Sequence, residues 1–92
     1  MAVNIASVAK EFSLTEEAVS RESIRAFLLE QLRLFDADRR ARCAKFGVKS
    51  LAEMDGLIQR GEVEEDDILE DFQEVDYLCG RIERVKAMLE DT

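Results

Sequence analysis

One uninterrupted stretch constrains the fold more than any other feature, because residues 15–46 contain neither glycine nor proline. Apolar side chains recur in it at spacings of three and four residues and their sums, at Ile24, Leu28, Leu32, Phe35, Cys43 and Phe46. This period is typical of an amphipathic α-helix. Ser13 with Glu16 predicts a capping box before the helix, and Gly47 follows where a left-handed residue is needed. The sequence therefore predicts a long helix over residues 15–46.

Two more helices are predicted after Gly47. Ser50 and Glu53 form a second capping-box pattern, and Gly61 ends the short apolar repeat that follows, which predicts a connector helix over residues 50–60. Residues 66–90 return to helical spacing, with acidic residues at the N-terminal end, where the helix dipole favours them. They predict a second long helix, in which Gly80 is a weak point or a close packing contact.

The expected lengths of these helices decide the architecture. A helix of about 32 residues is about 48 Å long, whereas a compact domain of this size has a radius of gyration of about 12 to 13 Å. We therefore predict an all-α protein forming one domain over residues 1–92. It has a short N-terminal helix within residues 1–14, followed by an elongated helical hairpin.

A second apolar strip on the long helix predicts self-association. Phe27, Leu34 and Ala41 lie about 100 to 140 degrees away from the main apolar strip, where a two-helix hairpin leaves them uncovered. We therefore expect a homodimer formed through these three residues. The alternative is that the N-terminal segment and the connector helix cover them within one chain.

The composition of the chain disfavours several classes of function. The 92 residues hold 13 Lys and Arg against 21 Asp and Glu, which gives a net charge of −8 and disfavours nonspecific attraction to nucleic acid or anionic lipid. The chain has no histidine, the commonest general base and metal ligand. No apolar run is long enough to span a membrane and no signal peptide is apparent, so a cytoplasmic location is expected. Cys43 and Cys79 are expected to be buried reduced thiols, and no cofactor is expected.

The charges are divided into two blocks. Residues 33–49 hold six basic residues, and residues 62–76 hold nine acidic residues and no basic one. In a hairpin the two blocks can face each other across the connector, as solvated faces with weak ion pairs. The alternative is that the acidic block stays partly unpaired and binds a basic protein partner. Its candidate residues are Glu62, Glu64, Glu65, Asp66, Asp67, Glu70 and Glu74.

Two charged residues fall within the apolar strips of the long helices. On a helical wheel, Arg39 lies among Leu28, Leu32, Phe35 and Phe46, and Asp71 lies among Phe72, Val75, Leu78 and Ile82. We predict that Arg39 and Asp71 form a buried ion pair that fixes the alignment of the hairpin. The alternative is that both lie near its open end and reach water.

Two further functions are considered from local patterns. Residues 8–21 resemble a helix-turn-helix, with Ala9 in the first helix and Val19 in the second, which makes Arg21 and Arg25 candidate DNA-binding residues. Nearby carboxylates and the lack of a third helix disfavour nucleic acid as a partner. Glu62 and Glu65 have the spacing of an acidic magnesium site in helical nucleotide hydrolases, but the required second acidic pair is missing. No residue pattern indicates a catalytic nucleophile, so a non-enzymatic role is expected.

Taken end to end, the sequence resembles the small helical antitoxin-type proteins of prokaryotic toxin–antitoxin pairs. The resemblance covers residues 15–90 and is carried by residues 22–28, 45–53, 61–63 and 70–78. It implies a non-enzymatic interaction protein that wraps or blocks a partner, here a basic toxin. It also implies DNA binding for autoregulation.

Overall fold

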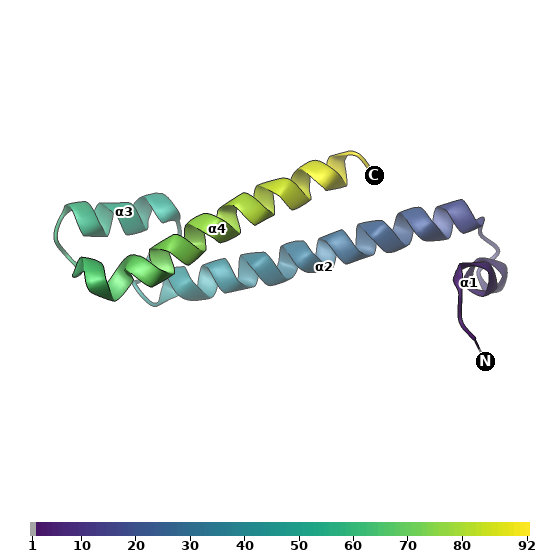
Figure 1. Cartoon of the computed structure of the whole chain (residues 1–92), viewed down its shortest axis with the longest axis horizontal. Helices are drawn as coiled ribbons and strands as arrows, with labels where there is room; N and C mark the ends of the chain where they lie inside the picture. Colours follow the sequence, from purple (N-terminus) through teal and green to yellow (C-terminus); the bar gives the residue numbers. More distant parts are fainter. Residues whose placement is uncertain (1) are drawn as a thin grey trace.

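The all-α elongated hairpin predicted from the sequence is confirmed. The computed structural model describes residues 2–92, and this part of the chain consists of four helices: α1 (Ile5–Glu11), α2 (Glu16–Ala44), α3 (Leu51–Gln59) and α4 (Glu65–Glu90). The helices α2 and α4 lie side by side and antiparallel, with α3 beside the closed end of the hairpin and α1 at the far end of α2 (Figure 1). The molecule measures 60 × 28 × 16 Å and its radius of gyration is 19.3 Å. This exceeds the value of about 13 Å for a compact domain of this size.

The ends of α2 are close to those predicted, but the cap differs. The hydroxyl of Thr15 accepts a hydrogen bond from the Ala18 amide at 3.0 Å, so Thr15 caps the helix. Ser13, the predicted cap, lies in the preceding turn with a left-handed backbone (φ 56°). At the other end Gly47 has φ 69°, in the left-handed region expected of it.

The caps around α3 confirm the connector helix. Ser50 Oγ accepts a hydrogen bond from the Glu53 amide at 3.1 Å. The Glu53 carboxylate accepts from the amide of Lys49 rather than from that of Ser50, so the capping box is offset by one residue. Gly61 turns the chain toward α4 with φ 69°.

The core is thickest at the closed end. Cys43, Met54, Ile68 and Val75 form one buried cluster that joins the end of α2, α3 and the first half of α4. Farther along the hairpin the buried side chains thin to a single strip, to which Leu28, Leu78, Ile82 and Val85 belong. At the far end Ala9 and Val19 are buried where α1 packs on α2.

The long helix α2 extends beyond α4. Arg25 Nη1 donates to Thr92 Oγ1 at 3.4 Å, which marks how far the end of the chain reaches along α2. Ile24 was predicted to lie in the buried strip, but it is 52% exposed. It lines a surface pocket with Asp91 and Thr92, the two residues that follow α4. Phe27, Leu34 and Ala41 are also exposed, so neither α1 nor α3 covers the second apolar strip. No helix in residues 2–92 is both long enough and apolar enough to cross a membrane.

Candidate functional site

The basic block on α2 is compensated largely within α2 itself. Four arginines pair with carboxylates one helical turn away: Arg33 with Glu30 (2.6 Å), Arg39 and Arg40 with Asp36 (2.9 and 2.8 Å), and Arg42 with Asp38 (3.0 Å). Pairs at these spacings contribute about 0.2 to 0.5 kcal/mol each to helix stability. These pairings leave few basic side chains of α2 free to pair with the carboxylates of α4.

Asp71 joins the two long helices. It accepts a hydrogen bond from Arg42 Nη1 at 3.0 Å and one from Lys45 Nζ at 3.1 Å, and the residue is only 9% exposed. The predicted pair of Arg39 with Asp71 is therefore wrong. Arg39 instead donates to Asp36 and to the carbonyl of Lys49. The cause is axial position, because Asp71 lies level with residues 42–45, one turn closer to the connector than Arg39.

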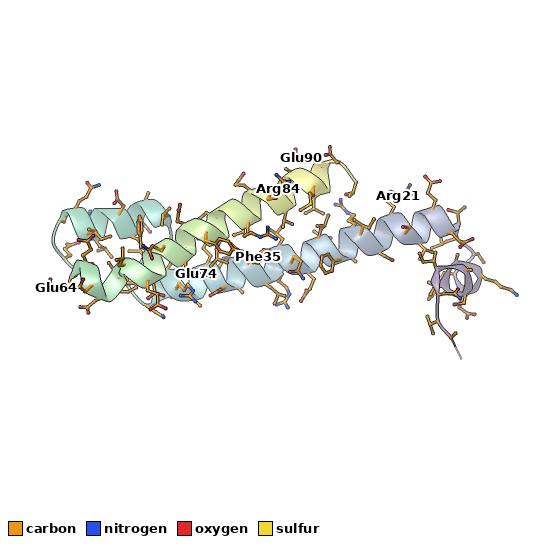
Figure 2. All side chains as sticks on the ribbon, viewed as in Figure 1. Arg21, Phe35, Glu64, Glu74, Arg84 and Glu90 are labelled. Atoms are coloured by element: carbon orange, nitrogen blue, oxygen red, sulfur yellow. The ribbon has the colours of Figure 1, made fainter. Side chains whose placement is uncertain are left out.

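The acidic block is mostly uncompensated. Within residues 62–76 only Glu62, with Arg60 at 2.9 Å, and Asp71 have ion-pair partners in the described chain. The other predicted partner-binding residues, which we call the acidic surface, are Glu64, Glu65, Asp66, Asp67, Glu70 and Glu74. All are exposed except Glu74, which is half-buried. Figure 2 shows Glu64 at the closed end and Glu74 farther along α4. In the described residues, direct ion pairs therefore join the two charge blocks only at Asp71.

The titratable groups with shifted pKa values belong to the ion pairs of α2, apart from the buried thiol of Cys43. The hydrogen bond from Arg39 lowers the pKa of Asp36, and the bond to Asp38 is the main cause that raises the pKa of Arg42. Burial raises the pKa of the Cys43 thiol, which keeps it protonated and unreactive. Both cysteines are free, Cys43 buried and Cys79 half-buried. Cys79 is therefore less buried than predicted.

The N-terminal end has the local geometry of a helix-turn-helix. Ala9 and Val19 pack between α1 and α2, and the left-handed Ser13 makes the turn between these helices. Arg21 and Arg25 are exposed, and Arg21 lies on the part of α2 beyond the end of α4 (Figure 2). Their surroundings are not basic, because the exposed carboxylates in this region are those of Glu11, Glu16, Glu17 and Glu22.

The acidic residues are not arranged as a metal centre. Across residues 2–92, the structure brings together no group of three or more His, Cys, Asp or Glu side chains that could hold a metal ion. Glu62 is paired with Arg60, and no second acidic pair faces it and Glu65. The geometry therefore gives no support to the magnesium-dependent hydrolase considered from the sequence.

Sequence analysis missed the partners of Asp71. Arg42 and Lys45 are three residues apart at the end of α2, which places them on one side of the helix, but this spacing does not give their level beside Asp71. It also missed Arg81, whose guanidinium lies 5.4 Å from the centre of the Phe35 ring. The fold is that of a small all-α hairpin protein whose second long helix is acidic in its first half.

The chain matches the model of the Uncharacterized protein MJ0235 family over residues 1–92, and it belongs to that family. No curated protein and no solved structure matches it.

Proposed function

We propose that this protein is a small non-enzymatic interaction module, of the antitoxin type, that binds a basic protein partner through the acidic surface. One observation carries the proposal: the carboxylates of the acidic surface have no ion-pair partner within residues 2–92, although a basic block lies on the neighbouring helix. Clustered like charges repel each other, and a cationic partner relieves that repulsion.

The packing of the helix that carries these carboxylates also supports the proposal. Ile68 and Val75 are fully buried, so they hold the first half of α4 rigidly against the rest of the core. The backbone that carries the acidic surface is thereby ordered before a partner binds, which lowers the ordering cost of binding. Charges at an exposed position chiefly raise the association rate and select the partner. Binding should therefore be fast and sensitive to salt.

The proposal is tested by titration with a protein that is encoded by an adjacent gene and has a basic net charge. Its affinity for the wild-type chain and for the variant E64Q/E65Q/D66N/D67N is measured by isothermal titration calorimetry at about 50 mM and about 200 mM salt, since exposed charges are screened over this range. We expect the variant to bind at least about tenfold more weakly at the lower salt concentration.

A matched control removes the same charge elsewhere. The variant E11Q/E17Q/E22Q/E90Q neutralises four exposed carboxylates distant from the acidic surface. We expect it to bind like the wild type. Equal loss of affinity in both variants, or no loss in either, would contradict the proposal, and circular dichroism verifies that each variant is folded.

DNA binding is a second candidate, favoured by the packing of Ala9 against α2 and by the left-handed turn at Ser13. In this alternative, Arg21 and Arg25 contact phosphates. The test is a mobility-shift assay with the DNA upstream of the gene at about 50 mM salt, where phosphate contacts are strong. A shift that is lost in R21A/R25A supports DNA binding, and the absence of any shift excludes it.

A further inference from the structure

A regular strip of residues runs along one flank of α4, beside its buried strip, and all its members are exposed except the half-buried Glu74. Its members alternate at spacings of four and three residues, which places them on one line along the helix: Glu70, Glu74, Tyr77, Arg81, Arg84 and Met88. We call these residues the α4 strip. Tyr77 is 58% exposed and Met88 39% exposed, so the apolar members lack a partner within the described chain. This spacing is the one by which helices pair in coiled coils.

The charges of the α4 strip are ordered about Tyr77. Glu70 and Arg84 each lie seven residues from Tyr77, on opposite sides, while Glu74 lies three residues before it and Arg81 four residues after it. A second α4 running in the opposite direction would therefore bring each glutamate to an arginine. This is the pattern of an isologous contact, in which the same patch of two identical subunits is self-complementary.

The four charged residues of the α4 strip are available for such a contact. None of them has a salt-bridge partner in the part of the chain that the structure describes. Arg81 lies over the Phe35 ring, which fixes the plane of its guanidinium and leaves its N–H groups free to donate. Figure 2 shows Glu74 and Arg84 on α4 on either side of Phe35.

Gly80 is a second, independent observation. Glycine is among the residues least favourable to a helix interior, and a Cβ at Gly80 would meet nothing within 4 Å in this chain. Its own packing therefore does not require glycine there. Gly80 follows Tyr77 by one turn, where a bare backbone allows another helix to approach closely.

We propose that two copies of this chain associate through the α4 strip, antiparallel and with the two-fold axis at Tyr77. Glu74 of each copy then pairs with Arg81 of the other, and Glu70 pairs with Arg84. This contact uses Glu70 and Glu74 and leaves the other carboxylates of the acidic surface, at residues 64–67, to the basic partner. The inference goes beyond the proposed function and does not depend on it.

The proposal is tested by sedimentation equilibrium on the full chain. The wild type is expected at twice the mass of one chain. The variants E70R/E74R and R81E/R84E each carry a strip of a single sign, and both are expected to sediment as monomers, with dimerisation weakened by about 100-fold or more. An equimolar mixture of the two variants restores opposite charges and is expected to form a heterodimer. Recovery by mixing shows that the single variants are folded.

Three results would overturn the proposal. One is a monomeric wild type at low salt, and another is a dimer that both charge reversals leave intact. The third is a dimer that is lost in F27E/L34E while the charge-reversed chains still dimerise, because this would place the contact on the exposed strip of α2. The control D76R reverses one exposed charge of α4 outside the strip, and it is expected to dimerise like the wild type.

Discussion

Arg42 Nη1 donates a hydrogen bond to Asp71 Oδ1 at 3.0 Å, and this bond ties α2 to α4 near the closed end of the hairpin. The Asp71 side chain is 12% exposed, whereas that of Arg42 is 28% exposed. Burial of a carboxylate is costly unless hydrogen bonds satisfy it, and Asp71 has such bonds from Arg42 and Lys45. The pair therefore selects one axial alignment of the two helices, since a slip by one turn would leave Asp71 buried and unpaired.

Replacement of Asp71 by alanine is expected to lower the free energy of unfolding by about 1 to 3 kcal/mol, because the charge-assisted hydrogen bonds are lost. A double-mutant cycle of D71A with R42A is expected to give a coupling energy of about 1 kcal/mol. The same cycle with R39A is expected to give a coupling near zero, because Arg39 bonds to Asp36 and Lys49. Denaturant unfolding measures both couplings, and a larger value for Arg39 would contradict the assignment.

Met54 is expected to be the most sensitive methionine. Its side chain is fully buried among Cys43, Ile68 and Val75, so M54A leaves a cavity and is expected to cost about 2 to 5 kcal/mol. Met88 is 39% exposed, and M88A provides the matched control with an expected cost below about 1 kcal/mol. Urea unfolding at low protein concentration measures both. Equal costs would show that α3 is not held by Met54.

Two glycines are expected to respond to alanine in opposite directions. Gly61 has φ 69°, which strains any residue with a Cβ, so G61A is expected to lower stability by about 1 kcal/mol or more. Gly80 lies within α4 with open space around its Cβ position, so G80A is expected to raise monomer stability by about 0.5 to 1 kcal/mol. Thermal unfolding of the two variants, at a concentration where the chain is monomeric, checks the opposite signs.

The loss of folding stability at acid pH should depend on Asp36. The hydrogen bond from Arg39 lowers the pKa of Asp36 below its ordinary value of 3.8. Its contribution to stability is therefore fully present above that pH and is lost as the pH falls through the folded-state pKa. The variant D36N is expected to be less stable than the wild type at pH 7 and to lose less stability on acidification below 3.8. An equal loss of stability on acidification in D36N and the wild type, measured by denaturant unfolding, would contradict this assignment.

Local signals in the sequence predicted the helices well. Ser50, Gly47 and Gly61 act within one turn of the backbone, so their effects could be predicted without knowledge of the tertiary contacts. The capping of α2 was assigned to Ser13 rather than Thr15, because both positions offer a hydroxyl and only the path of the turn distinguishes them.

The contacts between the helices were harder to predict. A helical wheel gives the direction of a side chain but not its level along the neighbouring helix, so it placed Arg39 rather than Arg42 against Asp71. The same limit applies to Ile24, which lies beside Asp91 and Thr92, after the last residue of α4, and is 52% exposed. The acidic surface was identified from composition, whereas its lack of ion pairs depends on which carboxylates the arginines of α2 reach first.

The concentration of the core at the closed end also has a kinetic consequence. Cys43, Met54, Ile68 and Val75 lie within 33 consecutive residues, so their cluster forms by closing short loops. We expect this segment to form early during folding. The contacts between α2 and α4 then form progressively away from the closed end. The opposite end, where a few side chains hold α1, should exchange its amide hydrogens fastest, since local opening there disrupts the fewest buried contacts.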